Sequence, residues 1–470
     1  MREKRWSRFP VVFLLVALVA LSCLLPGCSV FSNNKPACKL SFKNFTTREL
    51  LTLRFHIDAK TTGKPIKNAN LDLIEERTSK IRGLPLKKPI DFISMDSTCL
   101  RYVLIDSMNQ ETPPAETEAD QKLLVALGMI PPTMNLEEEI IALLTEQIAG
   151  SYDTKEKIIT IIQGEKQSAM DQVTLSHEVT HALQDQNFNL EKPPLDVKSY
   201  DGDNNLAVES LIEGDATQTM IVYGQKYLTP TQLMEAQSSS GEVSTTEFDS
   251  APLYIRQSLL FPYETGMKFV DEVKSNGGED SVDKAYGNPP LSSEQIIHPE
   301  EYAKGKFPVK VDVPDFSKTL GKGYHRINKD ALGEFDLDSW FEQFQVASGQ
   351  KAAEGWAGNA IQYYQGPQDD KVPKGSLGLG NYLVMSLFQW NTGDDAGSFM
   401  DSYRSLLQAR YKGKSTKTQT AGKAILFQGE DQYYYAGQSG KGTLLLQSNS
   451  KASIARALTQ FPGYPASPAK

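Results

Sequence analysis

The pattern of hydrophobic and polar positions predicts a helix, a strand and two further helices in the middle of the chain. In "NLEEEIIALLTEQIAG", apolar residues recur at helical spacing between Asn135, which can cap a helix, and Gly150, which can end one. The β-favouring residues from Ile158 to Ile162 are bounded by turn signals. They therefore predict a short strand directly after the helix.

After this strand, from about residue 168 to 186, the pattern returns to the helical period. The residues of the apolar stripe are Leu175, Val179, Ala182 and Leu183. At about 100° per residue, His177 lies roughly 200° around the axis from Leu175, so His177 and His181 point away from this stripe and can face a cleft. A second helix is expected from Asn205 to Tyr227.

Changes in the hydrophobic pattern and in composition along the chain predict three regions and an α+β fold class. Residues 46–130 form a mixed N-terminal region that ends in an acidic, Pro-containing loop. Residues 131–330 contain the predicted helices and strand and form the central domain. Residues 331–460 indicate a smaller C-terminal α+β unit, with strands arranged around a helix.

The first residues have the features of an export signal. Basic residues precede the apolar run "VVFLLVALVALSCLL", which is short for a membrane span, and "LPGC" follows, ending at Cys28. This arrangement resembles the lipobox of bacterial lipoproteins. The resemblance implies removal of residues 1–27, a lipid on Cys28, a tether at residues 28–45 and attachment to the extracytoplasmic face of the cell membrane. An uncleaved anchor helix is the alternative.

Charge and cysteine content narrow the choice of partners. The formal charge of the chain is −9, and it would become −12 without residues 1–27, which carry four basic residues and one acidic residue. An acidic, exported protein argues against nucleic acid as a partner. Export to an oxidising compartment would permit a disulfide bond between Cys38 and Cys99, although the unpaired state remains open. Their spacing does not suggest a metal site.

The segment "LSHEVTHALQDQNF" carries the chemistry that the sequence indicates most specifically. Two imidazoles four residues apart on one helix can bind the same zinc ion, and a glutamate directly after the first histidine can reach a water on that ion. His177, Glu178 and His181 meet this requirement. The other interpretation of the segment is a polar helix without metal.

A catalytic zinc ion also needs a third protein ligand and one open position. Glu213, in "LIEGDA" on the following predicted helix, is the expected donor, and Gly214 would let the two helices approach closely. Glu209 lies one turn earlier and is the competing ligand. Otherwise, Glu209 or Asp215 could orient a ligating imidazole.

The pair "HEVTH" and "LIEGDA" resembles the gluzincin branch of zinc metallopeptidases, in which a glutamate on a later helix completes the metal site. The resemblance implies a zincin-like domain with His177, His181 and Glu213 as zinc ligands and Glu178 as the catalytic carboxylate. The segments "EQIAGSYD", "HALQDQNF", "SSEQIIHPEEY" and "AEGWAG" are also similar to a little-characterised family of exported bacterial lipoproteins grouped with metallopeptidases.

These roles predict zinc-dependent hydrolysis of peptide bonds, with Glu178 moving the proton between water and the departing amine. The oxyanion needs a second donor. We expect His298 in this role, followed by Tyr302 and Tyr263; alternatively, His298 only ends a helix before Pro299.

The hypothesis includes a binding site for the substrate, and it has two alternatives. The resemblance to zincins also implies that the strand from Ile158 to Ile162, directly before the metal helix, is the sheet edge that holds an extended peptide or protein substrate. The alternatives to an enzyme are a structural zinc site, although no cysteine lies near the motif, and a catalytically inactive envelope binding lipoprotein that has kept a zincin scaffold.

Overall fold

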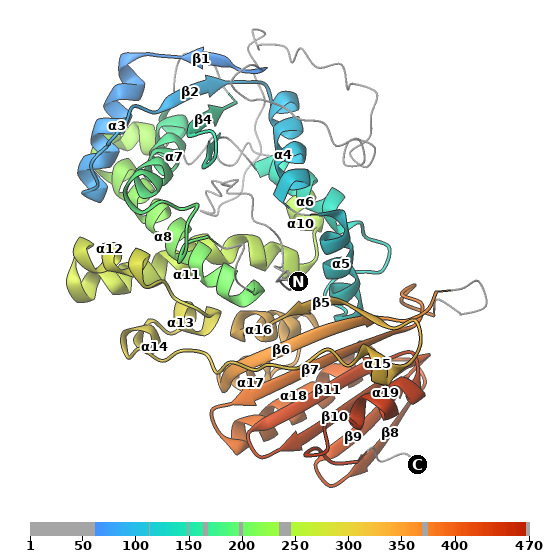
Figure 1. Ribbon diagram of the computed structural model, residues 1–470. Helices are drawn as coiled ribbons and strands as arrows, with labels where there is room; N and C mark the ends of the chain where they lie inside the picture. Colours follow the sequence, from blue (N-terminus) through green and yellow to red (C-terminus); the bar gives the residue numbers. More distant parts are fainter. Residues whose placement is uncertain are drawn as a thin grey trace.

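The computed structural model describes residues 62–111, 113–147, 150–162, 168–196, 201–234, 246–368 and 375–466. Figure 1 shows two parts: a mostly helical part that contains a small sheet, and a part built on a larger sheet that follows it in the chain. The fold class is therefore α+β, as predicted. The predicted signal segment, Cys28 and the tether lie outside the described residues.

The first part combines short strands with long helices. Its elements are β1 (Lys64–Ile66), α3 (Ala69–Arg82), β2 (Asp91–Ser94), α4 (Ser97–Glu111), α5 (Pro114–Leu127), α6 (Leu136–Gln147), β3 (Gly150–Asp153), β4 (Ile158–Ile161), α7 (Ala169–Phe188), α8 (Gly202–Tyr227), α10 (Thr246–Ser250), α11 (Leu253–Gly277), α12 (Glu279–Gly287), α13 (Ser293–Ile297) and α14 (Pro299–Ala303). The helices predicted at 135–150, 168–186 and 205–227 thus correspond to α6, α7 and α8.

The small sheet has the strand order β1-β2-β4-β3. β2 pairs with β4 in parallel and β3 pairs with β4 antiparallel, so β4 lies inside the sheet. The expectation that the strand before the metal helix forms the sheet edge was wrong, because β2 covers that side of β4. The edge strand next to β4 is β3. The sheet also joins strands from both sides of the boundary drawn at residues 130 and 131.

Local sequence explains where α6 and α7 begin. At the start of α6, the Glu138 N–H donates to the Asn135 side chain over 3.1 Å, as the capping pattern predicts. At the start of α7, Ser168 and Asp171 form a reciprocal capping box, and Asn189 ends the helix in the left-handed region. The predicted apolar stripe of α7 is buried against α3 and the small sheet in one core cluster.

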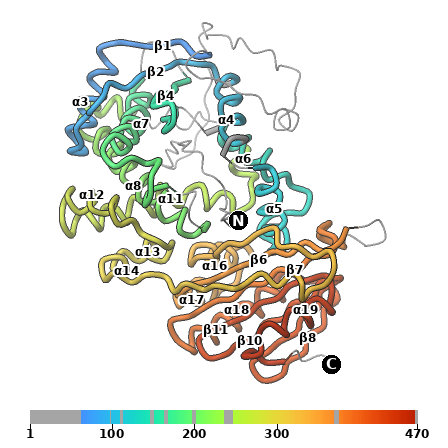
Figure 2. Tube along the Cα trace, viewed as in Figure 1, coloured from blue at the N-terminus to red at the C-terminus, as the bar shows by residue number. Residues whose placement is uncertain are grey.

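α8 and α11 pack against each other, and their backbones are in contact where they cross. Figure 2 shows the paths of the two helices as a Cα trace. A Cβ placed on Gly214 would lie 2.2 Å from the carbonyl carbon of Gly266, and one on Gly266 would lie 2.2 Å from the Ser210 oxygen. Only glycine fits either position. We expected Gly214 to bring the helices of the two motifs together, but the close approach that it permits is to α11.

The second part is a seven-stranded sheet with the order β5-β6-β7-β11-β10-β9-β8, in which all neighbouring strands are antiparallel. Its elements, with the helix that precedes them, are α15 (Ser317–Leu320), β5 (His325–Asp330), α16 (Glu334–Gln343), α17 (Gly349–Ala353), β6 (Trp356–Gln365), β7 (Tyr382–Trp390), α18 (Gly393–Arg410), β8 (Thr416–Ala421), β9 (Ala424–Gly429), β10 (Gln432–Ser439), β11 (Gly442–Ser448) and α19 (Lys451–Leu458). Its first strand thus precedes residue 331.

The C-terminal end of α5 joins the two parts. Arg410 and the Gln447 side chain both donate to the Ala126 carbonyl, over 2.9 and 2.7 Å, and the Trp340 indole donates to the Leu127 carbonyl over 2.9 Å. The last carbonyls of a helix have no partner within the helix, so these donors complete its hydrogen bonding. A cation near the negative end of the helix dipole adds a favourable interaction.

Two remaining predictions concern the N-terminal sequence. Cys99, on α4, is disulfide-bonded. Cys38 lies outside the described residues, so its pairing with Cys99 stays a prediction. Within the part of the chain that the structure covers, no helix is both long enough and apolar enough to cross a membrane.

Candidate metal centre

Three of the predicted ligands converge where α7 crosses α8. One ligand atom from each of His177, His181 and Glu213 lies within 4.8 Å of the other two. Glu213 Oε2 is 3.2 Å from His177 Nε2 and 3.6 Å from His181 Nε2. The two imidazole rings meet edge to face, with centroids 4.7 Å apart. Among the described residues, this is the one cluster of histidine, cysteine and carboxylate side chains with metal-ligating geometry.

Both imidazoles are fully buried rather than exposed in an open cleft. Burial lowers the pKa of His177 to about 3 and lowers the pKa of His181 well below its ordinary value; the neighbouring His177 adds to the second shift. A neutral imidazole keeps a lone pair for a metal ion. His181 Nε2 makes no hydrogen bond in the structure.

Glu178 lies between this cluster and the edge strand β3. A Cβ on Gly150 would lie 3.5 Å from Glu178 Cγ, which places the side chain against the start of that strand. Burial and the charge of Glu213 raise the pKa of Glu178 well above its ordinary range, while a backbone hydrogen bond from Tyr152 opposes the shift. Neither carboxylate oxygen makes a hydrogen bond of normal geometry. Buried groups of this kind occur at functional sites.

Tyr263, on α11, completes the wall of the cluster. Its ring is stacked on the His177 ring, with centroids 6.0 Å apart. Burial raises the pKa of Glu213 well above its ordinary value, and the hydrogen bond from Tyr263 opposes this shift. From the sequence, Tyr263 was expected as the oxyanion donor only after His298 and Tyr302. The crossing of α8 and α11 brings it to Glu213.

Glu209, the competing ligand, is buried one turn from Glu213 and is not part of the converging cluster. Its Oε1 has no hydrogen-bond partner, and burial, followed by the charge of Glu213, raises its pKa. Asp215 instead contacts Gln184, whose side chain contacts His181. The sequence motif does not indicate this role of Gln184, because the role depends on contacts with Ile212 and Asp215 on another helix.

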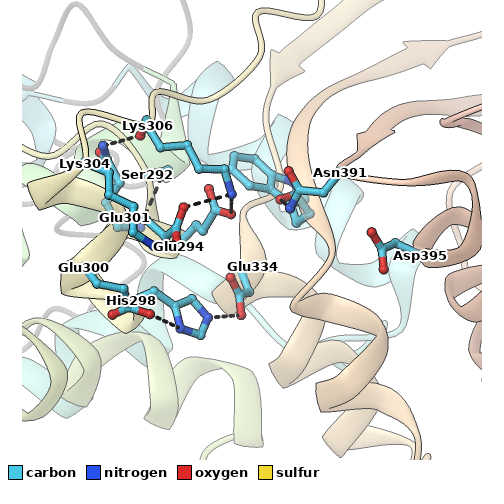
Figure 3. A network of polar contacts seen from close by, with 12 residues as sticks. Ser292, Glu294, His298, Glu300, Glu301, Lys304, Lys306, Glu334, Asn391 and Asp395 are labelled. Atoms are coloured by element: carbon cyan, nitrogen blue, oxygen red, sulfur yellow. Dashed lines mark hydrogen bonds and ion pairs between the residues drawn. The ribbon is translucent and has the colours of Figure 1, made fainter.

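His298 lies at the junction between α13 and α14 and faces α16. Its Nε2 is 2.9 Å from Glu334 Oε1 and its Nδ1 is 3.9 Å from Glu300 (Figure 3). These partners differ from the residues of the metal cluster. Tyr302 donates to the Asn288 carbonyl. The catalytic role of His298 stays a prediction, and its contacts favour the interpretation as a helix-end histidine.

Comparison with known proteins adds a family match only in the second part. A family model described as a domain of unknown function (DUF8575) matches residues 319–457, which include β5 to β11 and most of α19. The residues of the metal cluster lie outside this match. No curated protein matches the chain. No solved structure matches it either.

Proposed function

We propose that this protein is a zinc-dependent metallopeptidase of the gluzincin type, anchored at the extracytoplasmic face of the membrane by a lipid on Cys28. The observation that carries the proposal is the convergence of His177, His181 and Glu213 beside Glu178. The membrane anchor depends on the sequence motif alone.

The chemistry of the donor set fits zinc. Two neutral imidazoles and one carboxylate are ligands that catalytic zinc takes in proteins, with one position left open. The Nε2 atom of His181 is buried without a hydrogen bond, which costs about 1–3 kcal/mol for an unsatisfied polar group, and a metal ion on this lone pair would relieve that cost. A closed structural site would need a fourth protein ligand, and the described residues offer three.

A bound zinc ion would supply the Lewis acidity that activates water and polarises a peptide carbonyl. Glu178 would accept the proton from that water and pass it to the departing amine, because its carboxylate is near enough to interact with the charge of Glu213 and neither oxygen makes a hydrogen bond of normal geometry. Tyr263 is better placed than His298 to donate a hydrogen bond to the developing oxyanion. An extended peptide would add as a strand to β3, the edge strand next to Glu178, and this requires that Gly150 to Tyr152, which are buried in the structure, become exposed.

Metal content and peptide hydrolysis, measured on the same preparations, test this proposal. The purified protein should hold one zinc ion per chain and cleave casein or a peptide library, and a chelator should stop the cleavage. Glu178→Gln should keep the zinc ion and lose turnover. His177→Ala should lose both.

His325→Ala is the matched control, because His325 is exposed on β5 and the hydrogen bond of its ring is to the nearby Gly323 carbonyl. This variant should retain both zinc and activity. Full zinc loading of His177→Ala would contradict the ligand assignment. Zinc binding by the parent protein without any cleavage would favour the inactive binding lipoprotein.

A further inference from the structure

A buried chain of hydrogen bonds and ion pairs extends from His181 to the end of α3. Gln184 Oε1 lies 2.7 Å from His181 Nδ1, and Gln184 Nε2 donates to the Ile212 carbonyl and to Asp215 Oδ2, over 3.0 and 3.1 Å. Asp215 Oδ1 then pairs with Arg82 Nε over 2.6 Å. Both Arg82 and Gln184 are almost completely buried.

The acceptors around Gln184 fix the direction of its side-chain amide. A carbonyl oxygen accepts hydrogen bonds and cannot donate them, so the Ile212 oxygen requires the amide nitrogen on its side, and the carboxylate of Asp215 also accepts from this nitrogen. The amide oxygen must therefore face His181. Because that oxygen only accepts, His181 has to donate from Nδ1, which leaves the lone pair on Nε2 directed toward Glu213.

Asp215 is itself held on several sides. The Tyr286 hydroxyl donates to Asp215 Oδ2 over 2.7 Å, and Arg82 also pairs with Asp283 over 2.7 Å and with Glu279 over 3.4 Å. Arg82 and Tyr286 come from α3 and α12, so two further helices hold the carboxylate that orients Gln184. A carboxylate held in this way cannot rotate away from the glutamine without breaking these contacts.

We infer that Gln184 is a positioning residue that makes His181 an Nε2 metal ligand, and that Asp215, anchored by Arg82 and Tyr286, acts through Gln184. The inference deepens the proposed function and rests on its metal site. Outer partners of this kind set the tautomer and orientation of a ligating histidine and often change metal affinity about 10–100-fold.

Zinc affinity provides the first test, by competition with a chromophoric chelator. Gln184→Met keeps the length of the side chain and removes both hydrogen-bonding groups, so zinc affinity should fall about 10–100-fold. Gln186→Met is the matched control: Gln186 lies on the same helix and bonds to the backbone of Lys87 and Lys88. Gln186→Met should leave zinc affinity unchanged. Unchanged affinity in Gln184→Met would overturn the inference.

A double-mutant cycle tests whether Asp215 acts through Gln184. In Asp215→Asn, the new side-chain NH₂ group can donate to Gln184. This favours rotation of the glutamine amide so that its nitrogen faces His181, which would then accept at Nδ1 and carry its proton on Nε2. The substitution should weaken zinc binding in the parent protein and have little further effect in the Gln184→Met background. Equal losses in both backgrounds would show that Asp215 acts independently, and would overturn this step.

The tautomer itself can be measured without zinc or activity. In the metal-free protein, ¹⁵N chemical shifts of the imidazoles should show His181 protonated on Nδ1, and Gln184→Met should weaken this preference. Protonation on Nε2 in the parent protein would overturn the inference. If the parent protein bound no zinc, the proposed function would fail, while the tautomer measurement would still decide the role of Gln184.

Tyr286→Phe provides a milder variant if Asp215→Asn impairs folding. It removes only the hydroxyl that donates to Asp215 and keeps the ring that stacks on Phe188. Zinc affinity should fall by less than in Gln184→Met. Tyr286→Phe should have little further effect when Gln184 is already replaced by Met. A loss of thermal stability with unchanged zinc affinity in both Tyr286→Phe and Asp215→Asn would mean that the cluster is only structural, which would overturn its role in metal binding.

Discussion

Gly214 on α8 and Gly266 on α11 touch through their backbones, and this contact sets the distance between the third predicted ligand and Tyr263. A Cβ on either glycine would overlap backbone atoms at 2.2 Å. Glu213 directly precedes one of these glycines, and Tyr263 lies three residues before the other. The crossing therefore brings Tyr263 to both Glu213 and His177.

Alanine at this crossing should destabilise the protein. Gly214→Ala and Gly266→Ala force the helices apart, and the expected loss in the free energy of unfolding is about 1–3 kcal/mol or more, as for other overpacked positions. Gly224→Ala, also on α8, meets only side chains at 3.6 and 3.7 Å and should stabilise the helix by about 0.5–1 kcal/mol. Denaturant unfolding of the three variants measures this difference. Equal stabilities would contradict the close contact.

A pair of carboxamide variants separates the two candidate glutamates. Glu213→Gln removes a charged donor that lies within reach of both imidazoles, so zinc affinity should fall by more than about 100-fold, beyond the usual effect of an outer partner. Glu209→Gln should keep the zinc ion, because Glu209 is one turn away from the cluster. Chelator competition measures both affinities. The reverse order would identify Glu209 as the ligand.

Tyr263 and His298 can be compared as donors to the oxyanion. Tyr263→Phe should lower kcat about 10²–10³-fold with the zinc content unchanged, which is the usual effect of losing one such donor. His298→Ala should leave kcat near that of the parent protein, because His298 contacts Glu334 and Glu300 and not the residues of the metal cluster. Steady-state kinetics on a single peptide distinguish the two. A large fall in kcat for His298→Ala alone would restore the original prediction.

The ion pair at His298 should make stability depend on pH. The hydrogen bond to Glu334 is the main reason that the pKa of His298 is raised; partial burial opposes the shift, and the charges of Glu334, Glu300 and Glu294 add to it. Because the folded pKa is raised, this contribution is complete below about pH 6.5, the ordinary value for histidine, and is lost as the pH rises through the folded pKa.

His298→Gln tests this pH dependence. A hydrogen bond to a charged group contributes about 1.5–3 kcal/mol, and partial exposure places this one at the low end. The variant should therefore lose more unfolding free energy at pH 5.5 than at pH 9. Urea unfolding at the two pH values gives the difference. A loss of the same size at both would show that the charge of His298 does not contribute.

Short-range patterns predicted the elements that carry the site. The capping residue Asn135, the β-favouring run at β4 and the apolar stripe of α7 each depend on neighbours within a few residues, and each element forms where it was expected. The histidine pair follows from helical geometry alone. Glu213 could be placed on the next helix because its own segment resembles a known motif.

The rest of the site depends on contacts between segments far apart in the chain. Arg82 and Tyr286 are about a hundred residues or more from His181 and about seventy or more from Asp215, and no local pattern signals that they share a buried cluster. The edge strand was misassigned for the same reason, because β2 pairs with β4 across more than sixty residues. Periodicity describes one element at a time and carries no information about these pairings.

Hydrogen bonds to the end of α5 connect the region matched by the family model to the first part of the chain. Arg410 is half-buried beside the Tyr411 and Tyr434 rings and donates to the Ala126 carbonyl, which lies outside the match. In a fragment of residues 319–457 the helix would be missing. The Arg410 guanidinium and the side-chain donors of Trp340 and Gln447 would then lose their acceptors. Without the helix, water would have to replace the two carbonyl oxygens as acceptors for these three donors.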